Sequence, residues 1–178
     1  MASDVARRVA EALLARGETL AVAESSTGGL ILSLLTDIPG ASGWLGGGVV
    51  AYTNASKQHV LGVAALTLAT HGAVSGETAV EMARGVRELF GATWALGETG
   101  IAGPQTGRRS AKPPGLTYIA IHGAPHPVAD GQAANPAADG HVMERVVDYH
   151  LPDPGDRVAI KAALAQKALA VLLDLLVH

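Results

Sequence analysis

The chain has 178 residues, a length typical of one domain that can bury a substantial core. It contains no cysteine, which excludes disulfides, iron–sulfur clusters, zinc–thiolate sites and thiol catalysis. Its net charge of -3 argues against a dedicated nucleic-acid-binding protein, because such proteins carry a basic face. The 22 glycines and only 3% aromatic residues predict a core of small aliphatic side chains, with glycines where backbones approach closely.

Neither end of the chain has the pattern of a targeting or membrane segment. Charged residues interrupt the apolar residues of 1–16, so the apolar centre of a signal peptide is missing. The apolar stretch 158–177 contains Lys161, Lys167 and Asp174, which is typical of a packed helix rather than a bilayer-spanning one. We therefore expect a cytoplasmic protein that does not contact the membrane.

Apolar periodicity predicts alternating helices and strands along the first half of the chain. Asp4 stands near the start of the first helix and Gly17 ends it, while Ser75 is the expected N-cap of a later helix that Gly91 ends. The expected order is helix, strand, helix, strand, helix, helix and strand, over 4–15, 19–23, 30–38, 49–53, 54–61, 76–90 and 93–96.

The second half begins with a loop rich in glycine, proline and basic residues. The expected segments are a loop, a strand, a mobile hairpin insertion and a strand, over 98–114, 116–121, 123–140 and 142–151. Asp153 and Pro154 predict the N-cap and first position of a last helix that ends near Leu176. Strands and helices intermix without repeats, so we expect a single α/β domain over 1–178.

Small polar residues follow the first expected strand, at the edge where open α/β sheets bind ligands. A serine such as Ser25 on a tight strand-to-helix turn lies beside free backbone N–H groups, which can bind a phosphate or a developing oxyanion. Gly28 and Gly29 would let a ligand approach the backbone. The pattern equally fits a helix start in which the hydroxyls of 25–27 cap backbone donors.

Tyr52 and Lys57 follow the second expected strand, separated by a spacing that lets both reach one site. A lysine in a dry pocket has a lowered pKa and can act as a base toward a serine hydroxyl. For an isolated pair, an ordinary surface lysine and a tyrosine at the edge of the core is the more common arrangement.

The loop 99–107 is a third candidate, because backbone-rich loops of this kind wrap anions or flat polar substrates. Glycine and proline also simply form turns, and Arg108, Arg109 and Lys112 could serve only to solubilise the loop. The seven histidines lack metal-ligand spacing, so we expect no metal site. The acidic residues are scattered, and no catalytic carboxylate pair stands out from solvated charges.

Six ordered segments resemble the C-terminal domain family of CinA, the competence/damage-inducible protein. They are AESSTGG at 23–29, PGASGWLGGGVVAYTNASKQHVLGV at 39–63, HGAVSGETAVEMARG at 71–85, TGIAGP at 99–104, KPPG at 112–115 and PGDR at 154–157. That family includes nicotinamide mononucleotide (NMN) amidohydrolases. The resemblance implies a three-layer α/β/α fold with a mixed or mostly parallel sheet, and hydrolysis of NMN to nicotinate mononucleotide and ammonia.

The resemblance also implies roles for individual residues. Ser25 would be the nucleophile, Lys57 the group that activates it, and Tyr52 a neighbour that orients them or relays the proton. Substrate contacts are expected at Thr27, Gly28, Gly29, Thr99, Gly100, Gly103 and Arg157. The planar donors of Arg157 would suit a phosphate. No metal or organic cofactor is required, and the resemblance suggests a homodimer.

Several positions depart from the family pattern. Ser26 stands where cysteine is common, and Glu98 replaces an apolar or small residue. Thr106, Arg108, Arg109 and Pro114 change the loop, and the 123–140 insertion is longer than usual. CinA proteins often carry an N-terminal nucleotide-processing domain, and we expect this chain to be a stand-alone module.

Three functions remain open at this point. The chain could be an NMN deamidase, an amidase acting on another nucleotide-like substrate, or a non-catalytic module that binds a partner protein. Direct nucleic-acid binding is disfavoured by the negative net charge. We further expect eight glycines to gather around one pocket at the strand ends: Gly28, Gly29, Gly46, Gly47, Gly48, Gly100, Gly103 and Gly107.

Overall fold

The computed structural model describes residues 3–103, 111–123, 143–151 and 156–177. The helices of this part of the chain are α1 (Asp4–Arg16), α2 (Leu30–Thr36), the 3-10 turn η1 (Ala41–Gly43), α3 (Asn54–Leu61), α4 (Ala65–His71), α5 (Gly76–Phe90) and α6 (Arg157–Val177). The strands are β1 (Leu20–Glu24), β2 (Leu45–Val50), β3 (Trp94–Gly100), β4 (Leu116–Gly123) and β5 (Met143–His150).

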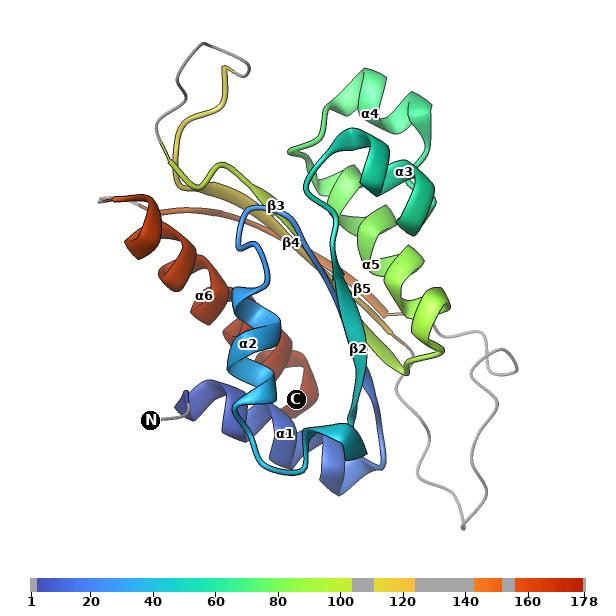
Figure 1. The fold of residues 1–178 in the computed structure, drawn as a ribbon, viewed down its shortest axis with the longest axis vertical. Coiled ribbons are helices and arrows are strands. Elements are labelled where there is room, and N and C mark those ends of the chain that lie inside the picture. Colours follow the sequence, from blue (N-terminus) through green and yellow to red (C-terminus); the bar gives the residue numbers. More distant parts are fainter. Residues whose placement is uncertain (1–2, 104–110, 124–142, 152–155, 178) are drawn as a thin grey trace.

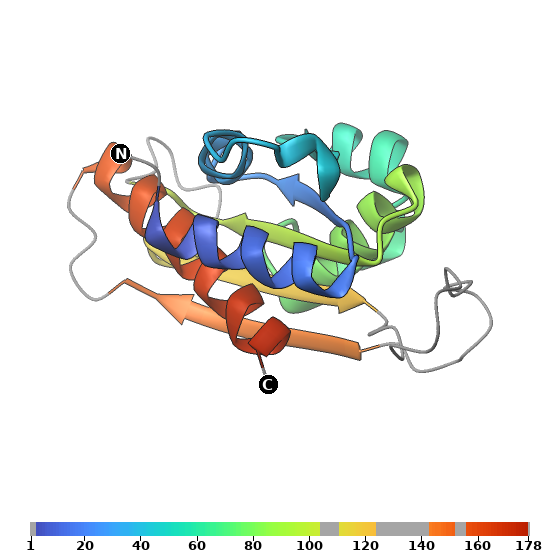
Figure 2. The same cartoon turned by 90° about the horizontal axis from the view of Figure 1, so that it is seen from below.

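The described strands form one mixed sheet in the order β2-β1-β3-β4-β5. Strand β1 lies parallel to β2 and β3, whereas β4 runs antiparallel to both β3 and β5. Helices α1, α2 and α6 cover one face of the sheet, and α3, α4 and α5 cover the other (Figures 1 and 2). The expected three-layer α/β/α fold is therefore confirmed.

The two faces of the sheet bury different kinds of side chain, because successive residues of a strand point to opposite faces. Leu20 and Val22 of β1 join the larger core beneath α1 and α6, together with Trp94. Ala21 and Ala23 face α5 instead. The face beneath α5 is built largely from alanine, so this helix can lie close to the sheet.

The close packing of α5 depends on glycine at two positions. A Cβ atom at Gly85 would overlap the carbonyl oxygen of Leu61 at the end of α3, and one at Gly97 would overlap the carbonyl oxygen of Ala79. Both obstacles are backbone atoms, which cannot turn aside as a flexible side chain can. The high glycine content is thus used partly for packing between layers.

Three glycines expected near the pocket lie elsewhere. Strand β2 begins at Leu45 rather than at Val49, so Gly46, Gly47 and Gly48 belong to the strand itself. A Cβ at Gly47 would lie 2.5 Å from the Phe90 ring, and one at Gly48 would meet the β1 backbone. The prediction that these glycines gather at the strand-end pocket was therefore wrong, because they allow close packing along the strand.

Some element boundaries differ from the sequence prediction. Strand β3 continues to Gly100, so Glu98 lies in the sheet rather than in a loop. Helix α4 was not expected, since it is short and buries only Leu68. The first turn of α6 is capped by Asp156, whose Oδ1 accepts a hydrogen bond of 2.8 Å from Ala159 N. The expected cap, Asp153–Pro154, lies outside the described residues, as do 104–110 and 124–142.

The described helices include none that is both long enough and apolar enough to cross a membrane. Helix α6 instead buries one apolar side against the sheet and α1, with Leu164, Leu169 and Leu172 fully buried. Its charged residues interrupt the apolar sequence, as expected for a helix packed on a core.

We predict that Gly85→Ala destabilises the protein although alanine favours helices. The added methyl group must displace the Leu61 carbonyl, so we expect the free energy of unfolding to fall by about 2 kcal/mol or more. Gly43→Ala is the matched control, because its Cβ would lie 3.9 Å from a Leu14 methyl group. Equal denaturation midpoints for both variants would contradict this account of α5 packing.

Candidate functional site

The candidate site lies where three parallel strands end. β1, β2 and β3 are adjacent, and their carboxyl ends come to the same edge of the sheet. The chain leaves β1 at Glu24, turns through Ser25–Gly29 and enters α2 (Figure 1). Such an edge is the usual place for ligands in open α/β sheets. Ser25 itself is nearly enclosed by the protein, since it is only 7% exposed.

Lys57 reaches this turn from α3. That helix begins with a capping box in which Thr53 and Ser56 exchange hydrogen bonds, and this fixes the first turn of the helix. The Lys57 side chain is buried, with Nζ 2.8 Å from Ser25 Oγ and 2.7 Å from the carbonyl oxygen of Ala51. The contact expected between Ser25 and Lys57 is present.

The pKa of Lys57 is lowered by its surroundings. Burial lowers it from 10.5 to about 8, while the negative charge of Glu98 acts in the opposite direction. At pH 7 roughly one molecule in ten then holds a neutral amine, against roughly one in three thousand for an unperturbed lysine. A neutral amine at this distance can accept the proton of the Ser25 hydroxyl.

Glu98 is a second buried charged group, and it lies directly behind the Ser25–Gly29 turn. Its side chain is 0% exposed. Its Oε2 accepts hydrogen bonds from the backbone amides of Ser25 at 3.0 Å and Thr27 at 3.1 Å. Its Oε1 accepts from the hydroxyls of Ser26 and, at 3.1 Å, of Thr117. The carboxylate therefore fixes the turn from within the protein.

Glu24 performs a similar task at the start of α2. Its carboxylate is also 0% exposed and accepts from the amides of Gly29 at 2.8 Å, Ile31 at 3.1 Å and Leu32 at 2.8 Å. A negative charge at a helix N-terminus is favourable because unpaired N–H groups gather there. The sequence interpretation treated the acidic residues as scattered solvated charges and therefore missed both carboxylates. The available signal was an acidic residue ending or interrupting an otherwise apolar strand.

Thr27 lies between the two carboxylates. Its Oγ1 is 2.7 Å from Glu24 Oε2 and 2.8 Å from Glu98 Oε2, and its side chain is completely buried. The Thr27 hydroxyl thus holds the turn and does not face a ligand, contrary to its expected role in substrate binding. Within the described part of the chain, the amides of Ser26 and Gly28 have no acceptor, so they are the donors of this turn left for a ligand.

Tyr52 lies at the rim of the site rather than on the serine–lysine pair. It is 59% exposed, and its hydroxyl accepts a hydrogen bond of 2.9 Å from Arg157 at the start of α6. These contacts do not support the prediction that Tyr52 lies beside Ser25 and Lys57, because they join its hydroxyl to Arg157 instead. Arg157 in turn lies against Gly103, where a Cβ would come within 3.4 Å of the arginine side chain.

Lys161 is one turn further along α6 and was not singled out in the sequence. Its Nζ would be 3.1 Å from a Cβ at Gly28, which adopts a positive φ of 64°. Gly28 therefore leaves room for the lysine over the Ser25–Gly29 turn. In the part of the chain that the structure describes, the Lys161 ammonium has no acidic partner. Arg157 and Lys161 together place two positive charges at the mouth of the site.

Thr99 and Gly100 lie at the end of β3 and are largely used for packing. Thr99 is 1% exposed, and its hydroxyl donates to the carbonyl oxygen of Ala73 at 2.7 Å. A Cβ at Gly100 would come within 2.7 Å of Thr117 Oγ1. Gly29, with φ of 96°, is the N-cap of α2. No three His, Asp or Glu side chains of the described residues gather as a metal site would require.

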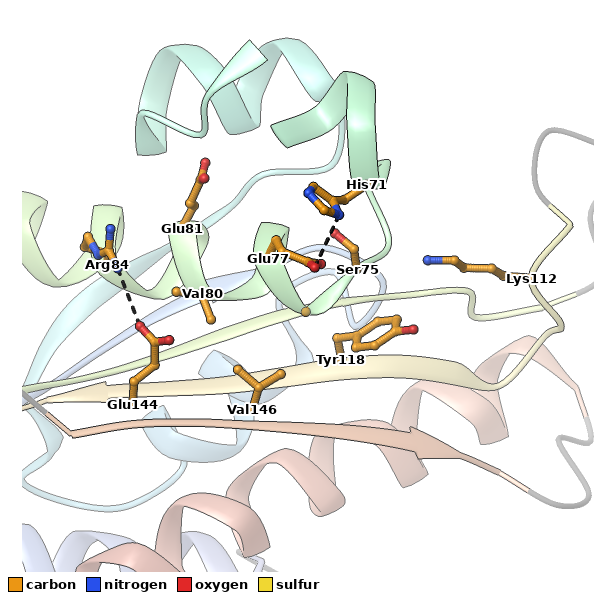
Figure 3. Close-up of a pocket in the computed structure, with 11 residues that line it drawn as sticks. His71, Ser75, Glu77, Val80, Glu81, Arg84, Lys112, Tyr118, Glu144 and Val146 are labelled. Atoms are coloured by element: carbon orange, nitrogen blue, oxygen red, sulfur yellow. Dashed lines mark hydrogen bonds and ion pairs between the residues drawn. The ribbon is translucent and has the colours of Figure 1, made fainter. Parts of the chain in front are cut away.

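A separate cavity of about 650 Å³ lies between α5 and the β4–β5 side of the sheet (Figure 3). Four of its ionisable side chains form two pairs: His71 with Glu77 at 3.2 Å, and Arg84 with Glu144 at 3.5 Å. Glu81 accepts from the Ala64 amide, and Lys112 donates to the Val74 carbonyl oxygen. Neither Ser25 nor Lys57 lines this cavity. It is therefore distinct from the candidate site.

Comparison with known proteins identifies relatives across nearly the whole chain. The CinA C-terminal domain model matches residues 2–176. A putative competence-damage inducible protein of Desulforamulus reducens is 55% identical over 113 residues, which are 64% of this chain and 27% of the relative. A CinA-like protein of a Synechococcus strain is 55% identical over 108 residues, 61% of this chain and 25% of that protein. The chain thus spans about a quarter of the length of these curated relatives.

Solved structures agree with the family match. A CinA-superfamily protein from Klebsiella pneumoniae is 32% identical with a TM-score of 0.80, covering 98% of this chain and 97% of its own. A competence/damage-inducible protein from Agrobacterium tumefaciens is 36% identical with a TM-score of 0.79, covering 97% and 93%. On the family match over nearly its full length, and on these similarities, the chain belongs to the CinA C-terminal domain family.

Proposed function

We propose that this protein is a serine amidohydrolase that converts NMN to nicotinate mononucleotide and ammonia. The observation that carries the proposal is the buried contact of 2.8 Å between Lys57 Nζ and Ser25 Oγ. A lysine amine is costly to bury, and among the residues that the structure describes its hydrogen-bond partners are Ser25 Oγ and the Ala51 carbonyl, with no carboxylate. Its position is explained if the amine serves as the base for the serine hydroxyl.

The reaction would proceed in two stages. Ser25 Oγ attacks the carboxamide carbon while its proton passes to the neutral Lys57 amine. The C–N bond then breaks, Lys57 returns the proton to the leaving nitrogen, and ammonia departs. Water cleaves the resulting ester, which restores Ser25 and releases the carboxylate. The carbonyl of Ala51 keeps the Lys57 amine oriented throughout.

The oxyanion of each stage would be stabilised by the free backbone amides of Ser26 and Gly28. The amides of Ser25 and Thr27 already donate to Glu98, so they are not available for this purpose. Preorganised backbone donors of this kind account for a large share of the rate of acyl transfer.

Arg157 and Lys161 would bind the phosphate of the nucleotide. Their side chains lie on one side of α6 above Gly103 and Gly28, at the mouth of the site. Contacts to the phosphate would anchor the nucleotide so that its carboxamide reaches Ser25, which uses remote binding energy for the chemistry. Tyr52 would orient the Arg157 guanidinium through its hydrogen bond.

Two alternatives keep the same site but change its use. The changed loop, which includes Arg108 and Arg109, could favour an amidase substrate other than NMN that is also nucleotide-like. A partner-binding module without catalysis would not require a lysine buried against a serine. The homodimer suggested by the family resemblance and the cytoplasmic location expected from the sequence both remain predictions.

We predict that Ser25→Ala and Lys57→Met each lower kcat/KM for ammonia release from NMN by roughly a thousandfold or more. The first removes the nucleophile and the second removes its base. Methionine fills the space of the Lys57 side chain without burying an amine, so Lys57→Met should unfold at the wild-type temperature or higher. Absence of release by the wild-type protein would exclude NMN as substrate, and release that survives Ser25→Ala would exclude the serine mechanism.

The pH dependence of the reaction follows from the state of Lys57. Only the neutral amine can accept the Ser25 proton, and its pKa is about 8. We expect kcat/KM to rise with pH through an acid limb whose midpoint lies near that value. Steady-state rates measured across neutral and alkaline pH will show this limb, whereas a midpoint near the ordinary lysine pKa would contradict the assignment.

Lys161→Met tests the phosphate contact. We expect the KM for NMN to rise by roughly tenfold, because a charge-assisted hydrogen bond to the phosphate is lost. Nicotinamide riboside, which lacks the phosphate, should be affected little. Lys167→Met is the matched control, since this lysine lies over the Tyr149 ring, 5.2 Å from its centroid. Equal losses for both substrates would show that Lys161 does not read the phosphate.

A further inference from the structure

We propose that Glu98 is the positioning residue of the Ser25–Lys57 pair. Its carboxylate holds the Ser25–Gly29 turn in place, and its negative charge acts on the Lys57 amine. This inference rests on the proposed function and assigns to the same site a residue that does not touch the substrate. It is carried by the contacts of the Glu98 carboxylate, which is completely buried.

Glu98 binds the turn on both sides of the nucleophile. Its Oε2 accepts from the amides of Ser25 and Thr27, and its Oε1 accepts from the Ser26 hydroxyl. The backbone before and after Ser25 is therefore tied to a single rigid group on β3. Because β3 is hydrogen-bonded to both β1 and β4, the carboxylate cannot shift without disturbing the sheet. The direction of the Ser25 hydroxyl toward Lys57 depends on this anchor.

The same contacts decide which amides remain free. Glu98 and Glu24 together occupy the amides of Ser25, Thr27 and Gly29. Ser26 and Gly28 alternate with them and stay available to an oxyanion. The nucleophile's own amide, which many acyl-transfer enzymes use for this purpose, is here committed to positioning.

The charge of Glu98 also reaches Lys57. Around Lys57, Glu24 ends β1, Tyr52 follows β2, Glu98 lies on β3, and α3 itself carries His59. Helix α5 adds five ionisable groups, Glu77, Glu81, Arg84, Arg87 and Glu88. Glu81 is engaged elsewhere, accepting from the Ala64 amide and the Thr67 hydroxyl. Glu98 is the group whose charge raises the pKa of Lys57 against the effect of burial.

Glu98→Gln removes the negative charge of the side chain but nearly keeps its shape. The glutamine oxygen can still accept from the amides of Ser25 and Thr27. Its NH2 group would face the hydroxyls of Ser26 and Thr117, which can rotate to accept rather than donate. The variant should therefore fold, while the negative charge near Lys57 is lost. Without that charge the pKa of Lys57 falls further below its ordinary value.

We expect Glu98→Gln to move the acid limb of kcat/KM for NMN to lower pH by roughly one unit. Thermal unfolding should change little. Glu24→Gln is the matched control, because Glu24 is equally buried beside the same turn. It accepts mainly from backbone amides, which can only donate and therefore cannot pair with a glutamine NH2 group. This control should lower stability more strongly and leave the midpoint of the acid limb in place.

A second readout does not depend on the activity. In protein labelled with 13C at the lysine Cε, the Lys57 resonance should titrate at lower pH in Glu98→Gln than in the wild type. Coincident titrations would overturn the inference, as would an equal displacement in Glu24→Gln. If the wild-type protein releases no ammonia from NMN, the proposed substrate fails, while the titration still decides whether Glu98 sets the charge at Lys57.

Discussion

The structure of the site depends on the burial of one lysine amine beside a serine hydroxyl. An ammonium group with no carboxylate in contact is poorly tolerated in a protein interior, so its surroundings favour the neutral amine. The Lys57 amine is in this situation, since its partners are the Ala51 carbonyl and the Ser25 hydroxyl, both of them uncharged. In the proposed mechanism, the lowered pKa that results from this burial lets the amine act as a base close to neutral pH.

The two buried carboxylates make this arrangement rigid. Glu24 satisfies the first amides of α2, and Glu98 holds the backbone around Ser25, with the Thr27 hydroxyl between them. In a turn fixed in this way, the amides of Ser26 and Gly28 remain without an acceptor among the described residues. Preorganisation by the fold, rather than rearrangement during the reaction, is the feature that such a site requires.

Much of the fold and part of the site could be predicted from the sequence. Apolar periodicity located helices such as α5, and the small polar turn after β1 indicated Ser25. The role of Glu98 could not be read in this way, since a carboxylate in a strand-end sequence looks the same whether it is solvated or held by five donors. Its partner Ser26 is another departure from the family pattern, and only the fold brings these two positions into contact. Lys161 was interpreted only as a charge on the last helix, because its neighbour Gly28 lies far away in the sequence.

The central claim is that the lowered pKa of Lys57 lets its amine act as the base for Ser25, and direct titration of the amine tests it. In wild-type protein labelled with 13C at the lysine Cε, comparison with Lys57→Met assigns the Lys57 resonance. The account predicts a titration midpoint near 8, well below those of the exposed lysines. A midpoint at the ordinary lysine value near 10.5 would contradict it, because only roughly one amine in three thousand would then be neutral at pH 7 and able to accept the serine proton.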